Sequence, residues 1–183
     1  MGAPARHSRA GGIGSLLLLA LVALIFFSDA LDSRSGVDRS LERRATSDEE
    51  PAQPAYAKRV IDGDTIEVSI DDHTDEVRYI GIDTPETVKP GTPIQCFGPQ
   101  ASALNHRLVE GHAVRLVFDS ERRDVYGRLL AYVYVGQRFV NARLVRLGYA
   151  RTLTIPPNDT HAGLFHRLAR AAGLSGRGLW GTC

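Results

Sequence analysis

Two acidic segments between positions 60 and 86 contain the residue types that bind cations. D-G-D-T occupies residues 62–65 and D-T-P-E occupies residues 83–86, each after an apolar run, and Arg78 lies between them. Carboxylates such as Asp64 and Asp83 that meet at neighbouring strand ends offer the oxygen ligands that Ca²⁺ and Mg²⁺ prefer. An arginine beside them can bind a phosphate through two parallel hydrogen bonds. The spacing therefore indicates a cation site that adjoins a phosphate.

Short strands must position these carboxylates, because apolar side chains recur around them. Residues 56–82 contain three such runs, and Asp62-Gly63, which joins the first two, tolerates the positive φ of a tight turn. The third run ends before Thr84-Pro85, a pair that suits the start of a short helical turn. The two acidic segments are therefore expected at strand ends.

The rest of the chain predicts alternating strands and helices. The patterns indicate strands at residues 114–119 and 129–135, a helix at 100–110, a helix capped by Asn141 and a last helix at 160–173. Five short strands with a helix after the third favour an α+β fold that is mainly β. We predict a five-stranded Greek-key barrel of the OB type with three helices.

Three motifs occur in an order that resembles the staphylococcal nuclease family. They are D-G-D-T at residues 62–65, R-x-x-x-x-D-T-P-E at 78–86 and Y-G-R at 126–128, and the resemblance covers about residues 56–180. It implies the same barrel, and a Ca²⁺ site formed by Asp64, Asp83 and the carbonyl oxygen of Thr84, with waters completing the shell.

The resemblance also implies roles for the residues around that site. Glu86 matches the general base or water-positioning group, and Arg78 and Arg128 match two arginines that bind the phosphate in the transition state. Tyr126 and Asp124 match residues beside the nucleotide. These are the site residues that the sequence predicts.

Each of these residues also has a structural interpretation. Asp64 and Asp83 suit a turn and a helix cap, and Glu86 suits the first turn of a helix. Arg78 could pair with an acid in the loop at residues 71–76, and Arg128 could be a turn residue. Their joint occurrence in the register of one family favours the functional interpretation.

The chain departs from the family pattern just before its Pro-Asn loop. Leu153 and Ile155 stand where the family's best-known member has two tyrosines that flank the base. An aliphatic side chain has no π-face, so we expect weaker base stacking there.

The charge is divided unevenly along the chain. Residues 56–100 contain 4 basic and 9 acidic residues, whereas residues 101–183 contain 12 basic residues, all arginine, and 5 acidic ones. The first part could hold a cation and the second a polyanion, unless both charges mix on one surface.

The N-terminal third predicts export. Arg6 and Arg9 precede a fifteen-residue apolar run at 13–27, which is typical of a signal peptide and short for a membrane span. Residues 1–30 are therefore expected to be a signal peptide cleaved after Ala30 or a retained signal anchor, so that the protein is secreted or tethered to the outer face of the cytoplasmic membrane. Residues 31–55 are predicted to be a flexible linker and residues 56–183 the domain.

The chain has two cysteines, Cys96 and Cys183. One disulfide is the natural expectation in an exported domain, with two separate thiols, a lipid-bearing cysteine or an intermolecular bond as alternatives.

The resemblance implies a calcium-dependent, sugar-nonspecific endonuclease. Such a metal-dependent phosphodiesterase hydrolyses DNA and RNA, with single strands favoured, to products with 3′-phosphates, and we expect a monomer. The alternative is a non-catalytic OB-fold module that binds nucleic acid or docks in the cell envelope.

Overall fold

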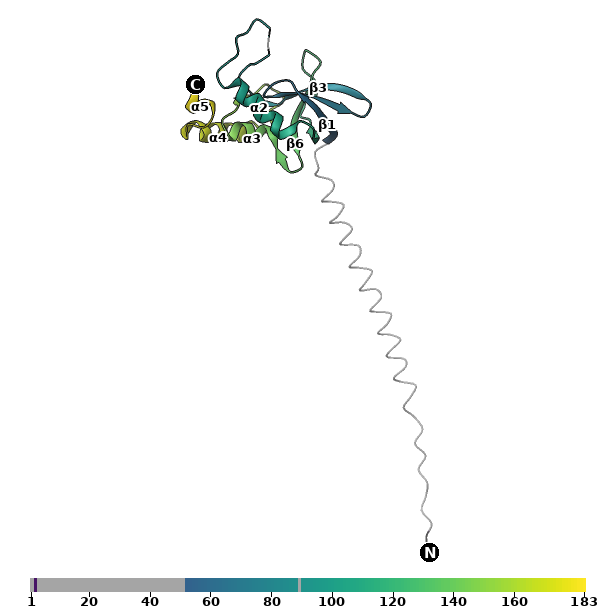
Figure 1. Cartoon of the computed structure of the whole chain (residues 1–183). Helices are drawn as coiled ribbons and strands as arrows, with labels where there is room; N and C mark the ends of the chain where they lie inside the picture. The colour runs from purple at the N-terminus through teal and green to yellow at the C-terminus, as the bar shows by residue number, and fades with distance from the viewer. Residues whose placement is uncertain (1, 3–51, 89) are drawn as a thin grey trace. The chain divides into compact units, whose positions relative to one another are not determined.

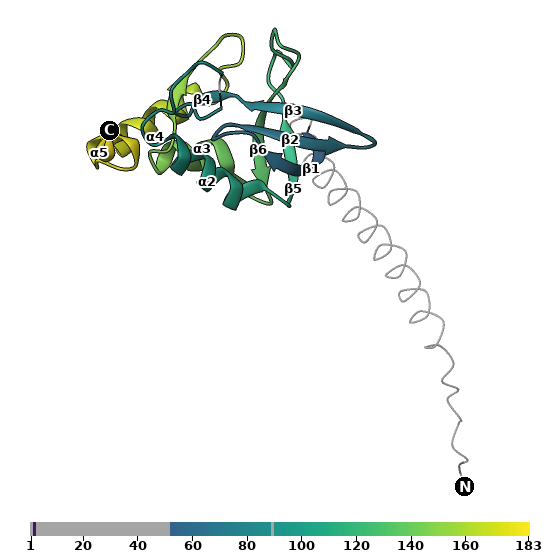
Figure 2. The same ribbon diagram turned by 45° about the horizontal axis from the view of Figure 1, so that its top comes forward.

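A closed barrel forms because five short strands pair around a single apolar interior. The structure is a computed structural model that describes residues 2, 52–88 and 90–183, so the predicted signal segment at residues 1–30 and the linker up to residue 51 lie outside the described residues. The barrel strands are β1 (Ala52–Val60), β2 (Thr65–Ile70), β3 (His73–Tyr79), β5 (Ala113–Val117) and β6 (Leu129–Val135). They lie in the order β3-β2-β1-β5-β6, and a parallel pairing of β3 with β6 closes the barrel (Figures 1 and 2).

In the part of the chain that the structure describes, two small strand pairs and four helices accompany the barrel. β4 (Gly81–Asp83) pairs antiparallel with β8 (Arg151–Leu153), and β7 (Arg138–Phe139) forms a hairpin with β6. The helices are α2 (Gly98–Val109), α3 (Val140–Arg146), α4 (Ala162–Leu174) and the short α5 (Leu179–Thr182). Both views show α3, α4 and α5 gathered together, with the C-terminus at α5 (Figures 1 and 2). The predicted OB-type barrel with three main helices is confirmed. Within the described residues, no helix is both long and apolar enough to cross a bilayer.

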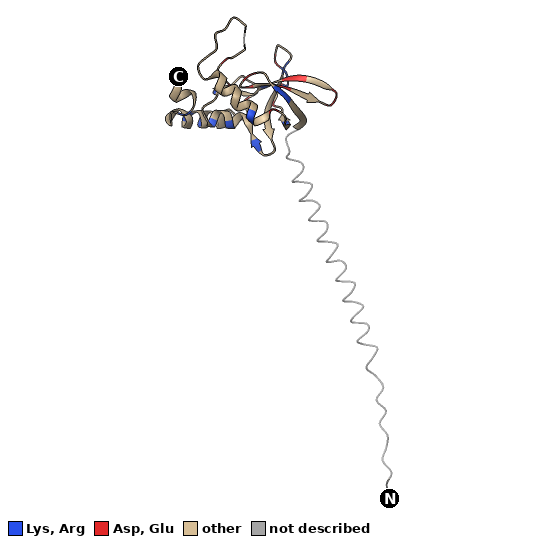
Figure 3. Cartoon of the chain, viewed as in Figure 1, with Lys and Arg blue, Asp and Glu red and all other residues tan. Residues whose placement is uncertain are grey.

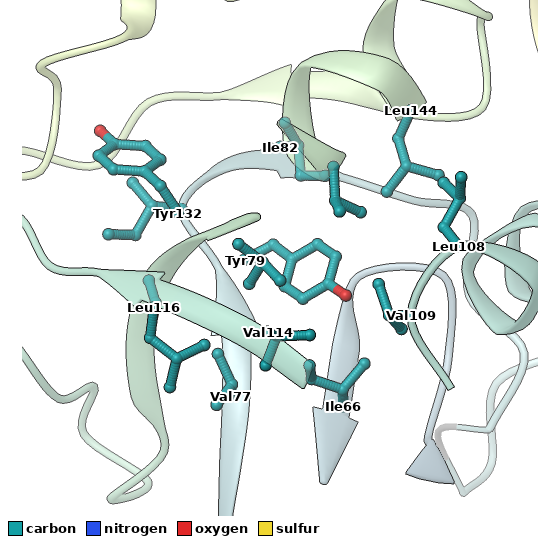
Figure 4. Close-up of a cluster of buried hydrophobic side chains, with 14 of the residues drawn as sticks. Ile66, Val77, Tyr79, Ile82, Leu108, Val109, Val114, Leu116, Tyr132 and Leu144 are labelled. Atoms are coloured by element: carbon teal, nitrogen blue, oxygen red, sulfur yellow. The ribbon is translucent and has the colours of Figure 1, made fainter. Parts of the chain in front are cut away.

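The core lies where the barrel interior meets the helices. Ile66 on β2, Leu116 on β5, Val109 of α2 and Leu144 of α3 belong to one cluster of buried side chains (Figure 4). All four are almost fully buried. Removing an aliphatic side chain of this size from water stabilises the fold by about 1.5–3 kcal/mol. The alternating apolar residues of the strands therefore fix the face that each strand turns inward.

The predicted linker is wrong at its C-terminal end. Residues 52–55 belong to β1 and pair in register with residues 114–117 of β5. This part of β1 is largely exposed, so its sequence carries no alternating apolar pattern that would have marked it as a strand. Pairing with a distant segment of the chain decides its conformation.

The turn at Asp62-Gly63 also differs from its prediction. Gly63 does not have a positive φ. Instead, a Cβ atom at this residue would lie 2.6 Å from Oγ1 of Thr84 and 2.9 Å from its Cγ2. Glycine is therefore required here because the Thr84 side chain packs directly against the backbone.

Two predicted helix starts are wrong. Asn141 lies inside α3, whose N-cap is Phe139, and its buried side chain accepts a hydrogen bond from the Val133 amide and donates one to the Ile80 carbonyl. It thereby satisfies one backbone group of β6 and one at the break between β3 and β4. The Thr84-Pro85 segment forms no helix, and the Thr84 amide and hydroxyl bond to the Asp64 carboxylate. In both cases hydrogen bonds to other segments of the chain replace the local capping that the residue types suggested.

Asp119 joins the end of β5 to the start of α4 and gives a prediction for stability. Its carboxylate accepts hydrogen bonds from the Tyr132 hydroxyl at 2.8 Å, the Ser120 amide at 2.9 Å, and the amide and hydroxyl of Thr160, each at 3.1 Å. Partial burial raises the pKa of Asp119, but these hydrogen bonds outweigh it and hold the pKa below its ordinary value.

Because the pKa is depressed in the folded state, Asp119 stabilises the fold above its ordinary pKa and loses that contribution as the pH falls through the folded value. We expect Asp119→Ala to lower the free energy of unfolding by about 1–3 kcal/mol at pH 7 and by less at about pH 2–3. Urea unfolding at both pH values measures this, with the exposed Asp72→Ala as control. A difference that stays the same at both pH values would contradict the prediction.

Candidate active site

Asp64 is a buried carboxylate held by residues from three segments. It follows the turn after β1, and the β2–β3 register places Thr65 opposite Arg78. Its Oδ2 accepts hydrogen bonds from the Thr84 amide at 2.6 Å and the Thr84 hydroxyl at 3.0 Å, and its Oδ1 accepts one from the Thr65 hydroxyl at 3.2 Å. Strand pairing thus brings the first acidic segment against the second, as the sequence predicts.

Arg78 connects the two predicted metal-binding carboxylates. Its Nη1 lies 3.3 Å from Oδ1 of Asp64, and its Nη2 lies 3.0 Å from Oδ1 of Asp83. Nη1 also donates to the carbonyl oxygens of Tyr79 and Ile82, both at 2.9 Å. The guanidinium is thereby held rigidly, and its partners are not the acids of the loop at residues 71–76.

Burial dominates the electrostatics of Asp64. It raises the pKa of this carboxyl to about 7, with the Asp62 carboxylate adding to the effect, while Arg78 and the bonds from Thr84 oppose it. Arg78 therefore offsets the cost of burying this carboxylate only in part. A hard cation would supply further positive charge, and carboxylate oxygens are the ligands it prefers.

The donor chemistry fits a metal that is completed by water. Asp64 is buried and Asp83 is about half exposed, so the pair lies between the interior and the surface. Within the part of the chain that the structure describes, no three or more His, Cys, Asp or Glu side chains form a metal-binding group. A cation here would take Asp64 and Asp83 and fill its remaining positions with carbonyl oxygens and water. A role for the Thr84 carbonyl stays a prediction.

Glu86 lies three residues beyond Asp83, on the segment that leaves this site. Its Oε1 accepts hydrogen bonds from the amides of Thr87 and Val88, both at 2.8 Å. Its own amide donates to the side chain of Gln95 at 3.0 Å. No helix follows, so the helical interpretation of this glutamate fails, and the local backbone fixes its carboxylate instead.

Arg128 is held by Asp124 across the turn that carries Tyr126. Nε of Arg128 donates to Oδ2 of Asp124 at 2.8 Å, and its Nη2 lies 2.7 Å from the same oxygen. Oδ1 of Asp124 accepts hydrogen bonds from the backbone amides of Tyr126 and Arg128, both at 3.0 Å. The Arg128 guanidinium carbon lies 5.5 Å from the centroid of the Tyr126 ring. Asp124 therefore shapes the turn and orients the arginine, a positioning role that the sequence did not predict; the predicted contact of Asp124 with the nucleotide stays a prediction.

One cleft collects half of the eight predicted site residues. Arg78, Asp124, Tyr126 and Arg128 line it, whereas Asp64, Asp83, Thr84 and Glu86 are not among its lining residues. It has a volume of about 360 Å³, and both Arg78 and Arg128 line it. Two aliphatic residues, Leu153 and Ile155, also line it, because β8 pairs with β4 and carries the following loop to the same place. Tyr126 borders the cleft with most of its side chain exposed. The cleft thus combines two arginines with apolar walls, an arrangement that suits a phosphate and a base.

Two asparagines that were not predicted hold the site in place. Asn158 lines the cleft, and its buried side chain exchanges two hydrogen bonds with the backbone of Glu121. Asn105 on α2 accepts a bond from the Tyr79 hydroxyl and donates one to the Asp62 carbonyl, both at 3.0 Å. Burial raises the pKa of Tyr79, so this hydroxyl stays protonated as a donor. A polar residue within an apolar helical pattern is the only sequence signal for Asn105.

Positive charge gathers on the helical side of the molecule. Figure 3 shows blue segments and no red ones along α3 and α4, whereas β3 carries red segments. The exposed arginines of the two helices are Arg143, Arg146, Arg167 and Arg170. The basic residues of α3 and α4 are therefore separated in the fold from the acidic residues of β3, which favours approach of a polyanion to the helical side.

Comparisons with known proteins agree with this geometry. A family model described as a staphylococcal nuclease homologue matches residues 76–182. The thermonuclease of Staphylococcus intermedius is 37% identical over 165 residues, which cover 90% of this chain and 94% of that protein. The thermonuclease of Staphylococcus hyicus is 36% identical over 164 residues, covering 90% and 95%.

Endonuclease YncB of Bacillus subtilis is 46% identical over 109 residues, covering 58% of this chain and 52% of that protein. The family model covers more than half of the chain, and the two thermonucleases match it along nearly their whole length. The OB-type barrel is consistent with the fold of that family. This chain belongs to the staphylococcal nuclease family.

Proposed function

We propose that this nuclease is a calcium-dependent, sugar-nonspecific endonuclease that hydrolyses DNA and RNA to products with 3′-phosphates. The observation that carries the proposal is the joint placement of Arg78 and Arg128 in one cleft, with Arg78 bonded to Asp64 and Asp83. Both arginines line the cleft in which a phosphodiester would bind, and Arg78 adjoins a pair of carboxylates that suits a cation. Relatives named thermonuclease and endonuclease support the reaction type.

The chain's own residues can perform hydrolysis as follows. Glu86 orients a water molecule and takes its proton as the water oxygen bonds to phosphorus. Arg78 and Arg128 donate hydrogen bonds to the phosphoryl oxygens, whose negative charge grows in the transition state. The bond from phosphorus to the 5′-oxygen breaks, and that oxygen leaves as an alcohol after it takes a proton from solvent. Asp64 and Asp83 would hold Ca²⁺, which when bound would supply further positive charge beside the phosphate.

The cleft walls support a preference for single strands. Val125 and Tyr126 are exposed at 93% and 82%, and Leu153 and Ile155 add aliphatic surface. A base can lie against such a surface only when it is unstacked, as in a single strand. Because neither aliphatic residue can stack on a base, we expect weak discrimination among bases.

The N-terminal segment supports export. An apolar run at residues 13–27 with a basic flank would place the domain outside the cytoplasm, either secreted or tethered to the membrane by that run. The protein would act there as a monomer.

A cleavage assay tests the proposed function and its metal. The purified protein is incubated with single-stranded DNA and with RNA in Ca²⁺, in Mg²⁺ and in chelator. We expect cleavage of both substrates in Ca²⁺ and none in chelator, because the positive charge at Asp64 and Asp83 is lost with the metal. Asp72→Asn, an exposed loop variant, serves as the control.

End-group analysis of the products identifies the bond that is broken. Oligonucleotides that carry 3′-phosphates support the proposal. Full activity in chelator would overturn the calcium dependence, and 5′-phosphate products would overturn the assigned leaving group. Binding of single strands by a folded protein without any cleavage would support the non-catalytic module instead.

A further inference from the structure

The segment that follows Glu86 is closed at its base by a reciprocal pair of hydrogen bonds. The Glu86 amide donates to Oε1 of Gln95 at 3.0 Å, and the Gln95 amide donates to the Glu86 carbonyl at 3.0 Å. The segment between them is exposed, with Val88 at 52% and Ile94 at 66%. Its position therefore depends on the two residues at its ends.

A disulfide holds the far end of this segment. Cys96, directly after Gln95, is bonded to Cys183, with 6.0 Å between their Cα atoms. Phe97 follows with a φ of 70°, an unfavourable conformation for a non-glycine residue, and its ring meets Tyr149 edge-on at 4.9 Å. The covalent bond and the aromatic contact thus fasten the chain immediately after Gln95.

Packing against Glu86 leaves little freedom where α2 begins. A Cβ atom at Gly98 would lie 3.0 Å from the carbonyl oxygens of both Pro85 and Glu86. The start of α2 therefore touches the backbone that carries the candidate base. A displacement of Cys96 would be transmitted directly to Glu86.

The other end of the disulfide is anchored to the body of the domain. The Leu179 amide donates to the Gly148 carbonyl at 2.8 Å, and the Leu179 side chain is buried. Trp180 lies under the Arg151 guanidinium, 4.8 Å from its carbon atom. Arg151 belongs to β8 and pairs in register with Asp83 of β4. The tail is thus tied to the strand pair that presents Asp83, one of the predicted metal ligands.

We propose that Gln95 and the Cys96–Cys183 disulfide act together as a clasp that positions Glu86 for catalysis. The clasp transmits the placement of the C-terminal tail to the Glu86 backbone, and through it to the carboxylate that the Thr87 and Val88 amides hold. Gln95 and the cysteines are positioning residues, because they touch neither the water nor the phosphate. The inference rests on the proposed nuclease function and adds residues that the family motifs do not contain.

Kinetics of clasp variants test the proposal. We expect Gln95→Ala, and Cys96→Ser combined with Cys183→Ser, each to lower kcat by about 10-fold or more, because small displacements of a catalytic group are costly. KM should change by no more than about twofold, since the cleft arginines are untouched. Gln95→Glu, which keeps an oxygen acceptor for the Glu86 amide, should recover most of kcat. Circular dichroism at the assay temperature establishes that each variant is folded.

A double-mutant cycle separates positioning from general loss of structure. If the clasp acts through Glu86, adding Gln95→Ala to Glu86→Gln should lower the residual kcat no further. An equal loss in both backgrounds would overturn the proposal, as would a wild-type kcat in Gln95→Ala. Treatment with dithiothreitol, which is oxidised to its cyclic disulfide as Cys96 and Cys183 become thiols, should reproduce the effect of the serine variant.

Amide hydrogen exchange keeps the inference testable apart from the nuclease activity. The Thr87 and Val88 amides donate to Glu86, so loss of the clasp should speed their exchange, while the Val133 amide in β6 should be unaffected. If the clasp variants exchange these amides faster but the wild-type protein does not cleave nucleic acid, the clasp is supported and the proposed function is rejected. Unchanged exchange would reject the clasp.

Discussion

Glu86→Gln is expected to lower kcat by about 10²–10⁴-fold, the range that a positioned general base contributes. Glutamine has a side chain of the same size, and its oxygen can accept hydrogen bonds from the Thr87 and Val88 amides, so the local structure should persist. What it loses is the capacity to take a proton from water. Substrate affinity should change little, because Glu86 acts on water rather than on the phosphate.

The measurement is steady-state cleavage of a defined single-stranded oligonucleotide in Ca²⁺, with thermal unfolding alongside. Glu76→Gln is the matched control, because Glu76 is exposed on β3, away from the cleft. We expect this control to retain wild-type kinetics. Turnover near the wild-type value in Glu86→Gln would remove this residue from the mechanism and leave water activation to another group.

Arg128→Ala is expected to lower kcat/KM by about 10²–10³-fold with little loss of stability. The arginine lines the cleft, and its loss removes a donor to the charge that grows on the phosphoryl oxygens. Its ion pair with Asp124 is partly exposed, and such pairs contribute about 1 kcal/mol or less to folding. Arg128→Lys should remain impaired, because an ammonium group cannot form the two parallel bonds of a guanidinium.

Arg78→Ala should behave differently, although it lines the same cleft. Its guanidinium pairs with the buried Asp64 and donates hydrogen bonds to two backbone carbonyls, so its removal should lower stability as well as activity. At a pH above the pKa of the Asp64 carboxyl, the free energy of unfolding should fall by about 3–5 kcal/mol.

Arg123→Ala is the control for Arg128→Ala, since Arg123 lies on the same turn as Arg128 but pairs with Asp75. Equal activity in Arg123→Ala and Arg128→Ala would contradict a specific role for Arg128.

The sequence predicted the parts of the site that depend on local order. Asp64, Arg78 and Asp83 were recognisable because they lie in short motifs next to apolar runs, and strand periodicity placed two of them at strand ends. The barrel itself followed from five short strands and one intervening helix. Local sequence signals failed where partners in other segments set a residue's conformation. Asn141 is an example, because its side chain bonds to the Val133 amide of β6 and to the Ile80 carbonyl just after β3 rather than capping a helix.

The amino-acid sequence alone thus determined the family motifs, the order of the five barrel strands and the three main helices, and the segregation of acidic from basic residues along the chain. Only the tertiary structure decided which groups meet. The β4–β8 pairing brings Leu153 and Ile155 to the cleft, Thr84 packs on Gly63 and bonds to Asp64, and the tail returns to Cys96 beside Gln95. Each contact joins segments more than 15 residues apart, and no local pattern records it, because burial and hydrogen bonding are satisfied only when the whole barrel closes.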